Sequence, residues 1–294
     1  MALSDNSRGI LLMCASMLAF TINDTFIKAL TEDIPVFQAM MLRGVLATSG
    51  LFLIASRVPG GFHLLPAGKD RKMLFWRTVG DLLSTVTFLL ALSHMPLANL
   101  SAIMQSLPLA VTLTAAVLLA TPIGIRRLIA IAVGFLGVML IIRPGAADFD
   151  RWSVIGLASV AFVVLRDLTT RSFSGNLPST TGAIWASVSV TTLGAIGTLA
   201  TGWQTVSTTI LAEAASAAVF LIIGYICAIK VMRVGDLSVV APFRYTSLLF
   251  AIFLGWARFG TLPDRMTLIG GAIVVASGVY MLFRERKRRA EAAS

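Results

Sequence analysis

The sequence predicts an all-α integral membrane protein whose ten transmembrane helices form two inverted five-helix repeats. Three observations indicate this fold class. First, 57% of the 294 residues are hydrophobic and 13% are charged, whereas soluble domains carry about 25% charged residues. Second, apolar runs of about 17–25 residues, long enough to cross a bilayer, recur along the chain. Third, residue patterns of the first half return in the second half in the same order.

The apolar runs fall into two sets of five, separated by short connections that carry proline, glycine and charged residues. The first set comprises Gly9–Leu30, Val36–Ser56, Met73–His94, Leu97–Ala120 and Ile125–Arg143. The second set comprises Trp152–Phe173, Ser179–Thr201, Ile210–Met232, Leu237–Ala257 and Thr267–Phe283. We therefore predict a first repeat over residues 9–143, a second over residues 152–284 and a basic cytoplasmic tail at residues 285–294.

Matching residues link the two halves beyond their hydropathy. Asn99-Leu100-Ser101 returns as Asp236-Leu237-Ser238, and the acid–base spacing of Asp24 and Lys28 returns as Asp167 and Arg171. Because five helices is an odd number, the second half must enter the membrane in the opposite sense. That inverted repeat is the architecture with which many secondary transporters alternate access to a site near the bilayer midplane.

The basic residues predict the orientation of the chain. Sixteen Lys and Arg residues fall on the side of the N-terminus and five on the other. By the positive-inside rule, both termini are cytoplasmic and the protein spans the inner (cytoplasmic) membrane. The net charge of +10 lies in loops rather than on one stripe, which argues against a nucleic-acid-binding protein. For the tail cluster that begins at Arg284, anionic-lipid recognition is the alternative to simple anchoring.

Signatures of enzymes and cofactor sites are absent from the sequence. There is no His-Glu-x-x-His, no Gly-x-Ser-x-Gly, no phosphate loop and no cysteine pair at metal spacing. The two cysteines, Cys14 and Cys227, lie within apolar spans and are interpreted as packing residues. We expect no cofactor, no metal and no catalytic residue, with an intramembrane enzyme or a channel as the alternatives from other classes.

Polar and ionisable residues inside the spans are the candidates for function, because such groups are costly in hydrocarbon and by default face the bundle interior or a water-filled cavity. Asp24 and Lys28 fall on one helix face, while Asp24 and Arg43, and also Asp81 and Arg244, lie at similar depths. We expect Asn23, Asp24, Asp81, Asn99, Gln105, Tyr225, Arg244 and Tyr245 to contact the substrate, and Lys28, Arg43, Arg166 and Asp167 to form gates or ion pairs.

Two prolines mark the expected substrate site. Pro108 and Pro242 lie at corresponding places in the fourth and ninth spans, and proline frees backbone carbonyls that are tolerated where they line a cavity. Arg244 can hold a carboxylate through two parallel hydrogen bonds, and the amine of an amino acid would then find Asp81. The alternative is that Arg244 only neutralises Asp81.

Small residues predict a close contact between the fifth and tenth spans. The fifth carries Gly134 and Gly137, and the tenth carries Gly270, Gly271 and Gly278. Such residues let membrane helices approach closely. Packing of these two spans on one another is the interpretation, with dimerisation as the alternative.

The chain as a whole resembles the drug/metabolite transporter superfamily, and within it the EamA-type ten-helix carriers. The matching features are Asn23-Asp24 with Lys28, Leu42-Arg43, the run from Ala91 to Pro108, Ala241-Pro242 with Tyr245-Thr246, and Gly260 with Pro263-Asp264. The resemblance implies a basket of ten helices around a central cavity lined by helices one, three, four, six, eight and nine. The family usually has Glu where this chain has Thr121 and Thr261.

The resemblance further implies a carrier of small metabolites, and the YddG-type amino-acid exporters are the nearest functional analogy. We expect amino-acid export by alternating access, with nucleotide-like metabolites or drugs as alternative substrates. Import and proton coupling remain open at this point. The expected partners are a small-molecule substrate and membrane lipids, without nucleic acid, and the chain is expected to be a monomer, with a homodimer as the alternative.

Overall fold

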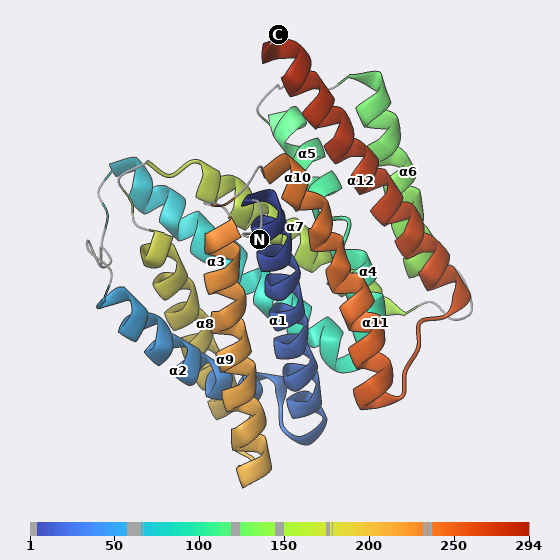
Figure 1. Ribbon diagram of the computed structural model, residues 1–294. Coiled ribbons are helices and arrows are strands. Elements are labelled where there is room, and N and C mark those ends of the chain that lie inside the picture. Colours follow the sequence, from blue (N-terminus) through green and yellow to red (C-terminus); the bar gives the residue numbers. More distant parts are fainter. Residues whose placement is uncertain are drawn as a thin grey trace. The chain divides into compact units, whose positions relative to one another are not determined.

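The computed structural model describes residues 5–57, 66, 68–118, 124–144, 150–174, 177, 179–231, 234 and 237–293. All regular structure in these residues is helical, as predicted (Figure 1). The helices are α1 (Asp5–Asp33), α2 (Val36–Ala55), α3 (Gly68–His94), α4 (Leu97–Met104), α5 (Leu107–Leu118), α6 (Ile125–Ile142), α7 (Arg151–Arg171), α8 (Ser179–Thr201), α9 (Thr208–Val231), α10 (Leu237–Val240), η1 (Ala241–Tyr245), α11 (Thr246–Phe259) and α12 (Arg265–Ala293).

These helices fall on the ten apolar spans of the sequence. Within the described ranges, nine helical segments are long and apolar enough to cross a membrane, α4 and α5 counting together as one. The predicted span Leu237–Ala257 is the exception, because it is divided among α10, the 3₁₀ helix η1 and α11. At the other extreme, α12 runs on through Ala293, so the predicted basic tail continues the last membrane helix.

The fourth and ninth spans are both interrupted, in accord with their prolines. In the fourth span, α4 ends at Met104 and α5 begins at Leu107, so that Pro108 lies in the first turn of a new helix. Proline is tolerated there because the first amides of a helix have no intrahelical acceptor. In the ninth span, Pro242 lies at the start of η1. Each break leaves backbone groups outside the regular α-helical ladder.

The chain divides into two compact units. Unit 1 contains Met1–Ile22, Met95–Leu157 and Ile223–Ser294, and unit 2 contains Asn23–His94 and Ala158–Ile222. Helices α1, α7 and α9 contribute to both units. Each unit thus takes matching helices from both halves of the sequence: unit 2, for example, holds α2 and α3 from the first half and α8 from the second.

Within unit 2, α2 packs along α8 through small and hydroxyl residues. A Cβ atom on Gly44 would collide with the side chain of Thr191, which shows how closely the two backbones approach. The Thr48 hydroxyl lies 2.7 Å from that of Ser187 and 3.2 Å from that of Thr191. Contacts of this kind replace the hydrophobic driving force that is missing between helices in lipid.

Within unit 1, α6 and α12 lie side by side (Figure 1). A Cβ atom on Gly137 would lie 2.8 Å from the carbonyl oxygen of Gly270. The predicted packing of the fifth span on the tenth through glycines is therefore confirmed. At one end of the helix pair, Arg143, which closes α6 in a left-handed conformation (φ 50°), forms an ion pair with Asp264.

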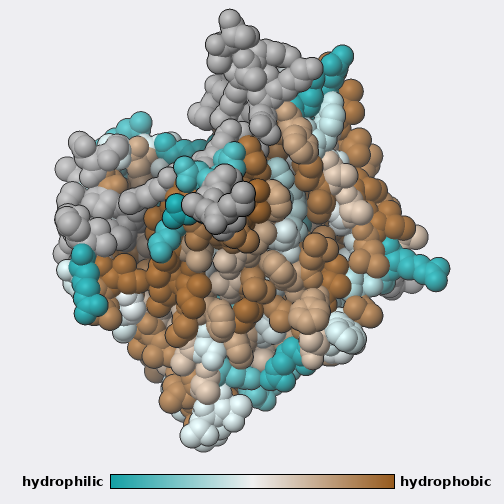
Figure 2. All heavy atoms as spheres, viewed as in Figure 1, coloured by the Kyte–Doolittle hydropathy of each residue, from teal (hydrophilic) through white to brown (hydrophobic). Residues whose placement is uncertain are grey.

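The surface fits a membrane environment. In the view of Figure 2, apolar side chains cover most of the coloured surface. Leu199 (87% exposed), Val117 (72%) and Leu118 (69%) are examples of large apolar residues that turn outward. Soluble monomers rarely expose contiguous apolar patches larger than a few hundred Å². The described helices thus present their apolar side chains to lipid.

Candidate functional site

The interruptions of the fourth and ninth spans meet within unit 1. The side-chain amide of Gln105, the residue that ends α4, donates a hydrogen bond of 2.7 Å to the hydroxyl of Ser247 in the first turn of α11. That hydroxyl donates in turn to the backbone carbonyl of Arg244 in η1, at 3.1 Å. Gln105 is buried. A three-group chain of hydrogen bonds therefore joins the two helix breaks.

Two further polar residues lie on the elements that this contact joins, Arg244 on η1 and Asn99 on α4. Arg244, in the last turn of η1, is partly exposed. Asn99 of α4 has a buried side-chain oxygen with no hydrogen-bond partner in the described part of the chain. A buried acceptor left without a partner costs about 1–3 kcal/mol. A ligand that donates a hydrogen bond to Asn99 would recover that cost.

Tyr245 lies deeper in the same unit. Its side chain is buried, and its hydroxyl lies where a Cβ atom on Gly278 of α12 would be. Only a glycine at position 278 admits the ring. The hydroxyl has no hydrogen-bond partner among the described residues. Tyr245 therefore presents a second buried polar atom beside the break in the ninth span.

Tyr225 is placed differently from the other candidates of unit 1. It lies on α9 and contacts Phe20 of α1 edge to face, with ring centroids 5.4 Å apart. Nearby, the Ser16 hydroxyl donates to the carbonyl of Gly224 at 2.9 Å. Tyr225 is 39% exposed. The contact between Tyr225 and Phe20 is a packing contact between α1 and α9.

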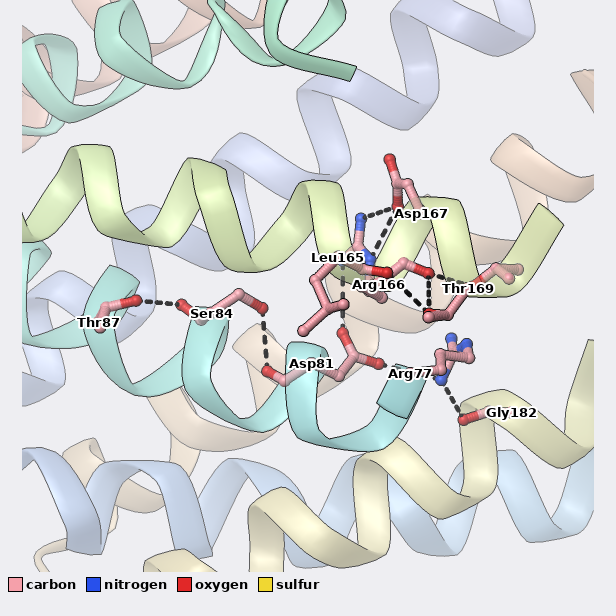
Figure 3. Close-up of polar contacts among 10 residues, drawn as sticks. Arg77, Asp81, Ser84, Thr87, Leu165, Arg166, Asp167, Thr169 and Gly182 are labelled. Atoms are coloured by element: carbon pink, nitrogen blue, oxygen red, sulfur yellow. Dashed lines mark hydrogen bonds and ion pairs between the residues drawn. The ribbon is translucent and has the colours of Figure 1, made fainter. Parts of the chain in front are cut away.

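In unit 2, four charged side chains form a network across α3 and α7 (Figure 3). The buried carboxylate of Asp81 lies 3.1 Å from Arg77 through one oxygen and 3.4 Å from Arg166 through the other. Arg166 also forms an ion pair with its neighbour Asp167, at 2.9 Å. The network contains two arginines and two aspartates, and its net charge is therefore zero.

The network also binds a third helix. Arg77 donates a 2.6 Å hydrogen bond to the carbonyl of Gly182 in α8 (Figure 3). A Cβ atom on Gly182 would lie 3.0 Å from the guanidinium of Arg77, and one on Gly80 would lie 2.9 Å from the backbone nitrogen of Arg166. Glycines thus open the space in which the charged side chains meet.

Asp81 has partners within unit 2 other than Arg244, the residue that its depth suggested. Its two carboxylate oxygens contact Arg77 and Arg166, and the expectation that Asp81 accepts a substrate amine stays a prediction. Similar depth in the membrane suggested Arg244 as a neighbour of Asp81. Depth alone, however, does not specify which face of one helix packs against another helix. The spacing of Arg77 and Asp81, four residues apart on one helix, could have identified the first partner.

Near the start of unit 2, Asp24 has Asn23 and Arg43 as partners. The Asn23 side-chain amide donates to its carboxylate at 2.9 Å, and Arg43 of α2 interacts with it electrostatically. Lys28, which lies on the same face of α1 as Asp24, donates a hydrogen bond to the carbonyl of Leu92 at the end of α3, at 2.9 Å. Arg43 and Lys28 are both buried. Asp24 and its partners therefore connect α1 with α2, and Lys28 connects α1 with α3.

The structure thus assigns the predicted residues to two groups. Unit 1 holds Asn99, Gln105, Tyr225, Arg244 and Tyr245, and unit 2 holds Asn23, Asp24, Lys28, Arg43, Asp81, Arg166 and Asp167. Sequence reasoning missed two members, Arg77 and Ser247. Nothing in the sequence singles out Ser247 from the other hydroxyl residues of the spans.

In the described residues, an all-helical fold with nine segments long and apolar enough to cross a membrane defines a multi-pass membrane protein. Residues 7–143 match the EamA-like transporter family. The pseudopaline exporter of Pseudomonas aeruginosa is 24% identical, over 93% of this chain and 95% of its own. The S-adenosylmethionine uptake transporter of Rickettsia bellii is 25% identical, over 97% of each chain.

Two further matches extend this picture. The riboflavin transporter of Vibrio cholerae is 25% identical over 64% of this chain and 63% of its own. A protein crystal structure superposes on 97% of this chain and 99% of its own with a TM-score of 0.63 and 18% identity, which shows the shared fold. The chain is thus similar to the EamA-like transporter family over residues 7–143, and to bacterial small-molecule transporters over most of its length.

Proposed function

We propose that this protein carries amino acids out of the cell across the cytoplasmic membrane by alternating access. The observation that carries the proposal is the hydrogen-bonded joint between Gln105 and Ser247, with Arg244 one turn away. Transporters of inverted-repeat architecture bind substrate near interrupted helices, where backbone and side-chain polar groups are available together.

The polar groups at the joint suit the two ends of an amino acid. The guanidinium of Arg244 binds the carboxylate, because a planar fork of donors matches two carboxylate oxygens. The side-chain oxygen of Asn99, a buried acceptor without a partner in the described ranges, receives the ammonium group. We prefer Asn99 to Asp81 as the amine acceptor, since Asp81 already contacts two arginines.

The substrates named for the relatives support a small-molecule substrate, and they leave two candidate substrate classes for this chain. S-adenosylmethionine, the substrate named for the Rickettsia relatives, is itself an amino-acid derivative. Riboflavin, named for others, has no α-amino acid group and favours the alternative of a nucleotide-like metabolite. The names of the relatives also cover both directions, since one is an exporter and others are uptake transporters.

The test is transport by the purified full chain in proteoliposomes. Vesicles are loaded with radiolabelled amino acids, S-adenosylmethionine or riboflavin, and efflux is followed with and without unlabelled competitor outside. We expect saturable flux of amino acids. The methyl ester of the same amino acid lacks the carboxylate and should compete with that flux only weakly. Saturable flux of riboflavin alone would establish the second candidate, and absence of saturable flux for all three would contradict the proposal.

A further inference from the structure

A shallow groove runs between α6 and α12 on the surface of unit 1. Its lining is Arg126, Ile129, Ala130, Val133, Ala276, Ser277 and Tyr280. The buried residues Ala130 and Ser277 form its floor, while Ile129, Val133 and Tyr280 are exposed along its sides. The groove is therefore open to the outside and lined mostly by apolar side chains.

The polar residues of the groove lie toward one end. Arg126 is the second residue of α6 and is exposed, and Val133 lies seven residues further, about 10 Å along the helix. On α12, Tyr280 shares a helix face with Arg284, one turn beyond it. The end of the groove thus carries a cation and a phenol, and a second arginine follows on the adjoining turn.

The groove has a cationic end followed by an apolar stretch. This arrangement matches the anionic headgroup and the acyl chain of one phospholipid molecule. We propose that the groove between α6 and α12 binds an anionic phospholipid, with its phosphate at Arg126 and one acyl chain along Ile129, Val133 and Ala276. Basic pockets between transmembrane helices on the cytoplasmic side bind anionic headgroups. The positive-inside rule predicts that α6 begins and the membrane part of α12 ends on that side.

The close packing of α6 on α12 explains why the groove can hold a lipid chain without a gap behind it. At Gly134 a Cβ atom would meet Leu109 of α5 and would lie 3.3 Å from the side chain of Ser277. The two helices therefore touch directly beneath the groove. A lipid there covers Ala276 and Tyr280 from outside and leaves the helix contact unchanged.

The proposal is tested by native mass spectrometry of the purified full chain. The protein is incubated with phosphatidylglycerol or with phosphatidylcholine of the same acyl chains, and retained lipid is counted. Three variants are compared with the unaltered chain: Arg126→Gln removes the cation, Ala276→Phe fills the channel, and Arg8→Gln is the control. Arg8 is an exposed arginine of unit 1, distant in sequence from the groove, with a side chain 61% exposed.

We expect the unaltered chain to retain phosphatidylglycerol over phosphatidylcholine. Arg126→Gln should lower phosphatidylglycerol retention about fivefold, the factor that corresponds to one basic residue near a membrane surface. Ala276→Phe should lower the retention of both lipids, and Arg8→Gln should change neither. All three substitutions are at exposed positions, and thermal unfolding of each variant verifies folding.

Equal retention of the two lipids by the unaltered chain would overturn the proposal. So would an equal loss for Arg126→Gln and Arg8→Gln, since the effect would then report overall charge. Unchanged phosphatidylglycerol retention in folded Ala276→Phe would exclude the acyl-chain channel. The measurement involves no transport, so its failure leaves the proposed function untouched.

Discussion

Gln105 and Ser247 lie 142 residues apart in sequence and are joined by a hydrogen bond of 2.7 Å. One belongs to the break of the fourth span and the other to the break of the ninth. A neutral hydrogen bond of this kind contributes about 0.5–1.5 kcal/mol to stability. The same contact therefore joins the fourth and ninth spans, one from each sequence repeat.

The first prediction concerns this hydrogen bond. Gln105→Ala and Ser247→Ala should each lower the free energy of unfolding, and the double variant should lose less than the sum of the two losses. The expected coupling energy is about 1 kcal/mol. Thermal or denaturant unfolding of the four proteins in detergent measures it. Strictly additive losses would show that the hydrogen bond contributes nothing to stability.

The second prediction concerns Arg244. Arg244→Gln should leave a folded protein that transports amino acids about 10- to 100-fold less efficiently, because a hydrogen-bonded charge pair contributes about 1.5–3 kcal/mol. The measurement is concentration-dependent flux in proteoliposomes. Arg258→Gln, at an exposed arginine in the last turn of α11, is the matched control. Unchanged flux kinetics in folded Arg244→Gln would remove this residue from the substrate site.

The sequence predicted the helices of this fold far better than it predicted the contacts between them. The predicted span Ser179–Thr201 coincides with α8, because bilayer thickness fixes the length of each apolar run. The prolines indicated which spans would be interrupted, but the end of α4 at Met104 depends on local backbone geometry. Likewise, Asp81 and Arg244 share a predicted depth, whereas the partners of Asp81 depend on which face of α3 meets α7.

The third prediction separates stability from function at Tyr245. Its buried hydroxyl has no partner among the described residues, and such a group costs about 1–3 kcal/mol. Tyr245→Phe should therefore raise the unfolding temperature or leave it unchanged. If the hydroxyl binds substrate, the same variant should transport with a higher KM. A variant that is both less stable and fully active would contradict this interpretation of Tyr245.

The fourth prediction concerns the charge network of unit 2. Asp81→Asn should destabilise the protein by about 3–5 kcal/mol, because it leaves two arginines opposite one aspartate in a buried site. Adding Arg77→Gln restores the balance of charge, with Arg166 still paired to Asp167. The double variant should therefore unfold at a higher temperature than Asp81→Asn alone.

The control for the network is Asp5→Asn, at an aspartate whose side chain is 79% exposed and pairs with Arg8. Exposed pairs contribute about 0–1 kcal/mol, so this variant should unfold as the unaltered protein does. A double variant of Asp81 and Arg77 that is less stable than Asp81→Asn would show that the Arg77 contact with Gly182 outweighs the charge balance.

The fifth prediction concerns Asp24 and Arg43, which interact electrostatically between α1 and α2. Asp24→Arg and Arg43→Asp each place two like charges together in a partly buried site, and each should strongly reduce the yield of folded protein. The charge-swapped double variant should recover part of that yield. Recovery stays incomplete, because the Asn23 amide that now donates to Asp24 would face a cation. The yield of monodisperse protein in size-exclusion chromatography is the measurement, and losses that add without recovery would show that the two residues are not partners.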